Sequence, residues 1–245
     1  MLHTFHATRG MVTSPHHLAS QSGLDILKKG GTALEAVVAT AATLSAVYPH
    51  MTGLGGDSFW LISYPDGRTC VIDACGAAAA QASLQLYRSA GHTSIPWRGG
   101  LAANSMAGAV SGWEEALRQS ASLQPNLPLQ DLLADATHYA ECGYAVSDSE
   151  ATLLHEKQAE LAENPAFVGS YTGADGLLTH GKIRRNPALG RSLRHLAEHG
   201  LHSFYTGPMA HARGADHSRA GSPLPREGVL AAKATLAQSH QNGNA

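Results

Sequence analysis

Apolar and polar positions alternate with a helical period at the start of the chain. From residue 19 to residue 27 the apolar side chains recur every three or four positions, as on one face of a helix. Ser14-Pro15 predicts the start of this helix, because a serine cap is followed by proline at the first helical position. Residues 28–31, two lysines and two glycines, predict its end. Residues 10–13 before it are expected to form a short strand.

A second helix is predicted from Thr32, because Glu35 three positions later completes a capping box. Residues 36–48 carry no charge on any side of this helix. A helix of that composition is normally buried all round. Pro49 is expected to end it.

The pattern then changes to that of a hairpin. Residues 59–62 form a continuous apolar run after a glycine loop, which predicts a strand covered on both faces. Pro65-Asp66-Gly67 is a turn signal, and residues 69–72 predict the returning strand. Beyond Ala77 the chain is predicted to be mainly helical, and the fold class is α+β. The helices are expected at residues 83–89, 111–120, 129–142, 149–162 and 187–199.

The last 35 positions differ in composition, because residues 211–245 contain no aromatic side chain and few large apolar ones. We expect one partial domain over residues 1–210 and a weakly ordered tail over residues 211–245. The tail is predicted to hold a short helix near residues 230–238.

Composition narrows the classes of function. Of the 245 residues 43% are hydrophobic, which excludes a wholly disordered chain, and 17 basic against 19 acidic residues give a net charge of −2. Such a chain lacks the excess of basic residues with which nucleic-acid-binding proteins neutralise phosphates. No segment reaches the roughly 20 apolar residues that cross a membrane. The amino-terminal residues have no apolar signal region, so we expect a cytoplasmic protein without a membrane partner. The spacing of Cys70, Cys75 and Cys142 fits no zinc ribbon, redox motif or disulfide framework.

Four short motifs have both a structural and a chemical interpretation. The glycine loop at residues 53–56 is neither a P-loop nor a dinucleotide fingerprint, so a tight turn is its ordinary interpretation. Ser111 stands one position late for a nucleophile elbow and is interpreted as a residue near a helix start. Thr137 lies inside a helical pattern and is interpreted as structural. His195, Glu198 and His199 match an inverted zinc-peptidase pattern, and a solvated helix face is the alternative.

Several segments, taken in order, resemble the start of the γ-glutamyltranspeptidase large subunit. The resemblance runs from about Thr8 to Tyr205, and faintly through residues 221–224. Its segments are Gly-Met-Val-Thr-Ser at 10–14, Gly-Leu-Asp-Ile-Leu-Lys-Lys-Gly-Gly at 23–31, Gly-Leu-Gly-Gly-Asp at 53–57 with Phe59, Met-Ala-Gly-Ala-Val-Ser-Gly at 106–112 and Phe-Tyr-Thr-Gly at 204–207.

The resemblance implies part of the N-terminal-nucleophile hydrolase fold, an αββα four-layer sandwich that is helix-rich after the first hairpin. It also implies an enzyme that attacks a small-molecule amide through an acyl-enzyme on a threonine, with the threonine's own amine as base and no cofactor or metal. The precursor cuts itself before that threonine, which then begins the small subunit.

This sequence departs from the family pattern in two places. It contains no recognisable processing site, so we expect no catalytic residue here, a small subunit as the missing partner, and no turnover by the chain alone. The second departure is Cys75, which stands where the γ-glutamyl enzymes carry an arginine for the substrate α-carboxylate, and Gly76 replaces the neighbouring acid. The candidate substrate-pocket residues are Gly55, Gly56, Asp57, Asp73 and Cys75.

Four hypotheses for the function follow. The first is the large-subunit part of a γ-glutamyl transferase or amidohydrolase. The second is an amidohydrolase for a non-glutamyl amide such as oxamate, because Asp-Ala-Cys-Gly-Ala-Ala at 73–78 resembles the branch of the family that contains oxamate amidohydrolase. The third is an inactive product of a truncated gene. The fourth and most distant is a zinc hydrolase built on His195, Glu198 and His199.

Overall fold

A computed structural model describes residues 4–123, 126–162, 164–173, 176–224 and 234–238 of the chain. Its described residues fall into two compact units, each built from two stretches of sequence. The first unit comprises Met1–Gly53 and Leu117–Glu198, and the second comprises Leu54–Ala116 and His199–Ala245. Among the described residues no helix is long and apolar enough to cross a membrane.

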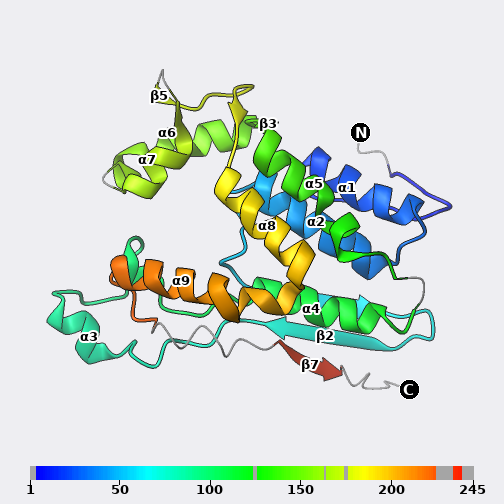
Figure 1. Cartoon of the computed structure of the whole chain (residues 1–245), viewed down its shortest axis with the longest axis horizontal. Helices are drawn as coiled ribbons and strands as arrows, with labels where there is room; N and C mark the ends of the chain where they lie inside the picture. Colours follow the sequence, from blue (N-terminus) through cyan, green and yellow to red (C-terminus); the bar gives the residue numbers. More distant parts are fainter. Residues whose placement is uncertain (1–3, 124–125, 163, 174–175, 225–233, 239–245) are drawn as a thin grey trace. The chain divides into compact units, whose positions relative to one another are not determined.

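Three helices form the centre of the first unit: α1 (His17–Lys28), α2 (Ala33–Val47) and α5 (Leu129–Cys142). They lie side by side (Figure 1), and their shared core includes Ile26, Ala39 and Leu132. The unit also contains α6 (Asp148–Leu161), α7 (Pro165–Tyr171) and most of α8 (Pro187–His199). Two small antiparallel sheets of two strands complete it, β3 (Tyr144–Ala145) with β6 (Ile183–Arg184) and β4 (Thr172–Gly173) with β5 (Gly176–Leu177).

Close packing of α1 on α2 depends on Gly23. A Cβ at this position would lie 2.9 Å from the carbonyl oxygen of Ala36 and overlap the hydroxyl of Thr40. The start of α2 is fixed by the capping box that the sequence predicts. The Thr32 N–H donates to Glu35 Oε2 at 2.7 Å, and the Glu35 N–H donates to Thr32 Oγ1 at 3.2 Å. The second carboxylate oxygen of Glu35 accepts from the Leu127 N–H at 2.7 Å, so this buried acid also fixes the segment that leads into α5.

Three expectations for this unit are wrong. Residues 10–13 form no strand, and α1 begins at His17 with His16 as its cap, two residues later than the cap predicted at Ser14. Ser14 instead donates to the carbonyl oxygen of His16 at 2.9 Å, so its hydroxyl supports the cap from outside the helix. Helix α2 is also not buried all round, because the Val37 side chain is 46% exposed.

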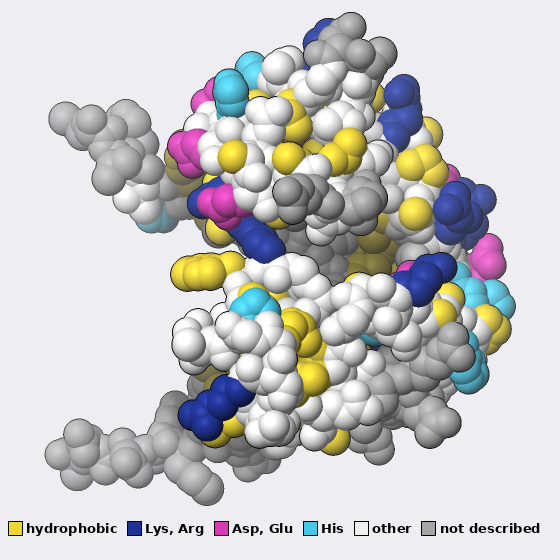
Figure 2. Space-filling view, turned by 90° about the vertical axis from the view of Figure 1, so that its left-hand side faces the viewer, with side chains coloured by type: hydrophobic (Ala, Val, Ile, Leu, Met, Phe, Trp, Pro, Cys, Tyr) yellow, Lys and Arg dark blue, Asp and Glu magenta, His cyan; other side chains and the backbone are white. Residues whose placement is uncertain are grey.

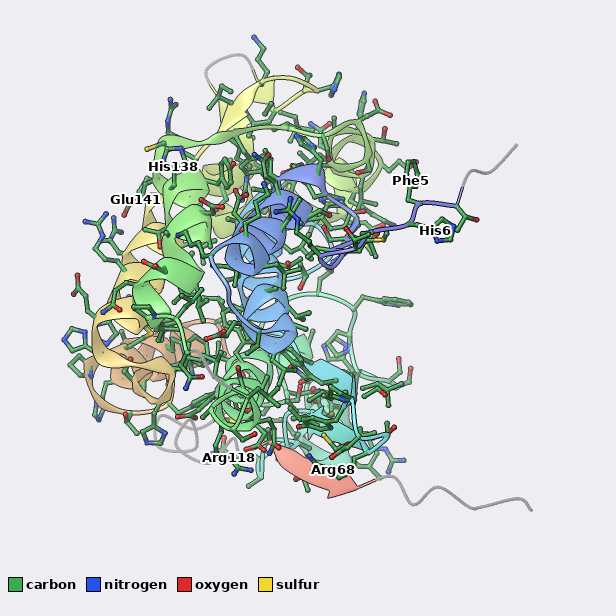
Figure 3. The ribbon with its side chains drawn as sticks, turned by 90° about the vertical axis from the view of Figure 1, so that its right-hand side faces the viewer. Phe5, His6, Arg68, Arg118, His138 and Glu141 are labelled. Carbon is green, nitrogen blue, oxygen red and sulfur yellow. The ribbon has the colours of Figure 1, made fainter. Side chains whose placement is uncertain are left out.

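The second unit contains a three-stranded antiparallel sheet in the order β1-β2-β7. The predicted hairpin is confirmed: β1 (Ser58–Ser63) pairs with β2 (Thr69–Ala74) in a register that places Phe59 opposite Asp73. Arg68 marks the connecting turn in Figure 3. The helical elements of this unit are α3 (Leu84–Ser89), η1 (Gly100–Ala102), η2 (Leu201–Phe204), α9 (Gly207–Arg219) and the first two turns of α4 (Ala109–Ser120).

The described residues cover only one of the two faces of the sheet. Trp60 and Ile62 are buried, whereas Phe59 is 69% exposed and Leu61 is 78% exposed. The prediction of a strand covered on both faces is therefore wrong for the described chain. Helix α4 approaches the covered face at Gly112, where a Cβ would lie 2.9 Å from the indole nitrogen of Trp60. Figure 2 shows exposed apolar side chains, in yellow, among the polar ones.

The described residues of the predicted tail include parts of a helix and of a strand. Helix α9 continues across the expected boundary at residue 210, and residues 235–238 form strand β7 where the sequence suggests a helix. The difference has a tertiary cause, because β7 pairs with β2, more than 160 positions earlier in the chain. Residues 225–233 lie outside the described residues, so weak order there stays a prediction.

Candidate functional site

Three of the predicted pocket residues meet at the open end of the β1–β2 hairpin. Asp57 immediately precedes β1, and its Oδ1 accepts a hydrogen bond from the Gly76 N–H at 2.8 Å. The Cys75 Sγ lies 3.7 Å from Asp57 Oδ2, and the Cys75 N–H donates to Asp73 Oδ1 at 2.9 Å. Asp57 thus joins the start of one strand to the turn that follows the other, and Cys75 stands between two exposed carboxylates.

The glycine loop joins the same site through its backbone. The carbonyl oxygen of Gly56 accepts from the N–H groups of Gly108 at 2.9 Å and Ala109 at 2.8 Å, at the start of α4. Gly53 and Gly55 do not have a positive φ, and a Cβ on either would meet nothing within 4 Å. Neither backbone conformation nor packing among the described residues therefore requires glycine at these two positions. A glycine without such a reason often marks a place where a ligand or another backbone approaches closely.

Gly76 and Gly108, by contrast, are required by close backbone packing. A Cβ on Gly76 would overlap the carbonyl oxygen of Met106 and lie 2.5 Å from its carbon. A Cβ on Gly108 would overlap the carbonyl oxygen of Ala74 in the same way. The Met106 N–H donates to the carbonyl of Ala77 at 2.9 Å, so the chain after β2 runs directly against residues 104–108.

Tyr205 supports this packing and was not identified from the sequence as a site residue. Its hydroxyl accepts from the Ser111 N–H at 2.9 Å and donates to the carbonyl of Ala107 at 2.8 Å, and its ring is 2% exposed. The Phe-Tyr-Thr-Gly segment at 204–207 was the available signal. Ser111 is buried and donates to the carbonyl of Gly108 at 2.7 Å, as expected for a residue near a helix start.

The electrostatics of the site keep Cys75 in its thiol form. The charge of Asp57 raises the pKa of the Cys75 thiol, with further contributions from desolvation, the hydrogen bond to Asp57 and the charge of Asp73. Reactive cysteines have the opposite environment, next to positive charges that stabilise a thiolate. Cys75 is therefore a neutral hydrogen-bonding group and not an activated nucleophile.

The remaining candidates lie on helices. Thr137 is inside α5 and donates to the carbonyl of Leu133 at 2.8 Å, and Figure 3 shows the neighbouring His138 on the outer side of that helix. His195, Glu198 and His199 lie on α8, whose buried face carries Leu193 and Leu196. In the described part of the chain no three His, Cys, Asp or Glu side chains could together hold a metal ion. The inverted zinc-peptidase pattern also needs a carboxylate from later in the chain, and Glu227, the glutamate available there, lies outside the described residues.

Comparison with known proteins identifies the family. The family model described as Gamma-glutamyltranspeptidase matches residues 19–239. The chain belongs to the γ-glutamyltranspeptidase family. Among curated members of this family, it is 47% identical over 242 residues to the oxamate amidohydrolase proenzyme of Klebsiella pneumoniae, covering 97% of this chain and 46% of that protein. It is 37% identical over 204 residues to the glutathione hydrolase-like YwrD proenzyme of Bacillus subtilis, covering 83% of this chain and 38% of that protein.

Solved structures of the γ-glutamyltranspeptidase family confirm the predicted fold class. The γ-glutamyltranspeptidase of Helicobacter pylori superposes with a TM-score of 0.86 at 25% identity, covering 95% of this chain and 66% of that one. The transpeptidase CapD of Bacillus anthracis, at 22% identity, shares the fold with a TM-score of 0.75, covering 94% of this chain and 71% of that one. The chain spans about half the length of the curated relatives that it matches, or less.

Proposed function

We propose that these 245 residues form the large-subunit part of an amidohydrolase that acts on an amide without a γ-glutamyl group. In this proposal a threonine in a small subunit, outside the 245 residues, attacks the amide carbonyl. Ammonia or an amine leaves, and water then hydrolyses the acyl-enzyme to a carboxylate. The curated relatives support the two-part architecture, because they are named proenzymes and are about twice as long as this chain.

The environment of Cys75 is the observation that carries the proposal. In the γ-glutamyl enzymes that the sequence resembles, an arginine at this position holds the substrate α-carboxylate. Here a neutral thiol stands 3.7 Å from Asp57, and the charges acting on it are the carboxylates of Asp57 and Asp73. A glutamyl α-carboxylate placed at Cys75 would lose a charge-assisted hydrogen bond and face two like charges.

The backbone at Gly76 excludes a simple return to the γ-glutamyl pattern. The acid that follows the arginine in those enzymes cannot stand at Gly76, because its Cβ would overlap the carbonyl of Met106. An acid at position 76 would therefore require the chain after β2 to move away from Met106. This favours a substrate class that makes no use of an arginine–acid pair at this position.

Oxamate satisfies this requirement although it is itself an anion. Its carboxylate is bonded directly to the amide carbon, whereas the α-carboxylate of a γ-glutamyl group lies four bonds away, about 5 Å in an extended chain. A group placed to hold the distant carboxylate would not reach that of oxamate. The identity of 47% to the oxamate amidohydrolase proenzyme is consistent with this substrate.

Hydrolysis of γ-glutamyl amides is the second candidate, and the identity of 37% to the glutathione hydrolase-like proenzyme of Bacillus subtilis favours it. The two candidates differ in how they depend on the substrate α-carboxylate.

Reconstitution tests the proposal. This chain would be produced together with the part of the Klebsiella oxamate amidohydrolase proenzyme that it does not match. Ammonia release from oxamate would then be compared with aniline release from a γ-glutamyl anilide. We expect oxamate turnover by the assembled enzyme and none by the 245-residue chain alone. Preference for the γ-glutamyl substrate would establish the second candidate, and turnover by the isolated chain would contradict the assignment of the nucleophile to a small subunit.

A further inference from the structure

The first turn of α1 is capped by a histidine. The His16 Nδ1 accepts a hydrogen bond from the Leu18 N–H at 3.3 Å, and the His16 carbonyl accepts from the N–H groups of Ala19 and Ser20, both at 3.1 Å. A ring nitrogen of histidine accepts a hydrogen bond only while it carries no proton. The side chain is 5% exposed, so water does not readily replace it as the acceptor.

Aromatic rings from several elements surround this cap. The His17 ring stacks on His16 with a centroid separation of 4.8 Å. Two tyrosine rings also lie against His16: Tyr48, at the end of α2, with its ring centroid 6.4 Å away, and Tyr144, in β3, with its centroid 6.3 Å away. His50 lies against Tyr48 at 4.2 Å, and both of its ring nitrogens are buried without a hydrogen-bond partner in the described part of the chain.

The nearest buried acid is already paired. Both carboxylate oxygens of Glu150, in α6, accept from the Tyr144 hydroxyl at 2.9 Å, and Oε1 lies 3.9 Å from Nε of Arg184 in β6. Glu150 and Arg184 are 0% and 3% exposed. The charged and titratable groups that face His16, directly or through Tyr144, are therefore His17, Tyr48, His50, Tyr144, Arg184 and Glu150, whose charge is paired with that of Arg184.

We propose that His16 is an acid-sensitive cap, and that protonation of its Nδ1 opens the first turn of α1 while the rest of the first unit stays folded. The proton removes the acceptor of the Leu18 N–H. It also places a positive charge at the positive end of the helix dipole, among two further histidines. Helix α1 remains attached below this turn, because Ser22, Gly23 and Ile26 are buried on its inner face.

The direction and size of the pH dependence follow from the groups that surround His16. Burial, followed by the charges of His17 and His50, lowers the pKa of His16 to about 4, whereas an exposed histidine titrates near 6.5. The opened turn binds the proton more tightly, so the closed turn is fully stable above pH 6.5 and loses stability as the pH falls toward 4. Between pH 7.5 and 5 these two values give an increase of about 30-fold in the opening equilibrium.

Hydrogen exchange measured by mass spectrometry on the 245-residue chain tests this proposal. The protection factor of a peptide spanning residues 17–22, corrected for the intrinsic pH dependence of exchange, should fall about 30-fold from pH 7.5 to 5. Peptides from α5 serve as the internal reference and should keep their protection. In H16N the asparagine caps the helix without titrating, and the fall should disappear. H17N is the matched control, because it changes an exposed neighbouring histidine and leaves the cap itself in place. The fall should persist in H17N but be smaller, since the charge of His17 contributes to the lowered pKa of His16.

Three results would overturn the proposal: an unchanged protection factor in the unmodified chain, the same fall in H16N, or loss of protection in α5 together with α1. If H16N fails to fold, the imidazole of His16 is titrated directly by NMR on histidine-labelled protein. A titration midpoint that does not coincide with the loss of protection in the first turn would then reject it.

Discussion

Replacement of Gly76 by alanine tests the backbone packing behind the candidate site. The added Cβ would overlap the carbonyl of Met106, so the 74–76 and 106–108 segments would have to separate. This separation would break two hydrogen bonds, from the Met106 N–H to the carbonyl of Ala77 and from the Gly76 N–H to Asp57 Oδ1. At about 1 kcal/mol each, together with about 1–3 kcal/mol for overpacking, we expect G76A to lower the free energy of unfolding by about 3–5 kcal/mol.

The assay is urea denaturation of the 245-residue chain followed by circular dichroism, with G55A as the matched control. Gly55 has no positive φ, and a Cβ there meets nothing within 4 Å. G55A should therefore change the free energy of unfolding by less than about 1 kcal/mol, and it can even stabilise the chain by restricting its unfolded state. If G76A lowers the free energy of unfolding by less than about 1 kcal/mol, or if both variants lower it equally, the close approach of Gly76 to the Met106 carbonyl is refuted. In the reconstituted enzyme G55A should reduce kcat/KM, because the added methyl group would obstruct a substrate or a small subunit that approaches the open loop.

Three further outcomes are expected. C75R in the reconstituted enzyme should raise kcat/KM for a γ-glutamyl amide by at most about 10- to 100-fold, the value of one hydrogen bond to a charged group, and no gain would show that the carboxylate is held elsewhere. Y205F should lower the free energy of unfolding by about 1–3 kcal/mol, since the Ser111 N–H loses its acceptor, and an unchanged urea midpoint would contradict this role. The isolated chain should bind a hydrophobic dye strongly through its exposed sheet face, and the double variant F59S/L61S should bind markedly less; equal binding would place the dye site elsewhere.

Local signals in the sequence predict many of the helices well. The bounds of α5 and α8 agree with the expected ranges, and the capping box at Thr32 and Glu35 is present. These features depend on contacts within a few residues of the chain. The cap of α1 was missed because histidine is not a preferred cap, and its role here depends on burial among rings from distant elements.

Expectations that depend on distant parts of the chain were less reliable. The apolar run at residues 59–62 carries no information about whether a second layer covers Phe59 and Leu61. Strand β7 exists because β2 offers it hydrogen-bond partners, which no pattern within residues 235–238 shows.

The candidate site was predictable in part. The structure brings Asp57, Asp73 and Cys75 into contact, and Gly56 joins them through hydrogen bonds to the start of α4. Gly55 is next to Gly56 in the chain, but no contact among the described residues requires a glycine at this position. The parts played by Gly108 and Tyr205 arise from backbone approach and a buried hydroxyl, for which spacing in the sequence gives no signal.

The contact between Gly76 and the carbonyl of Met106 also restricts the order in which this site could change during evolution. A lineage with this backbone would lose stability on acquiring an acid at position 76 by one substitution, before any new specificity could be selected. The 104–108 segment would first have to move away, and that change alone would bring no catalytic benefit. The effect of a substitution at position 76 therefore depends on the position of the 104–108 segment. A change to an arginine–acid pair is disfavoured even where a γ-glutamyl substrate is abundant.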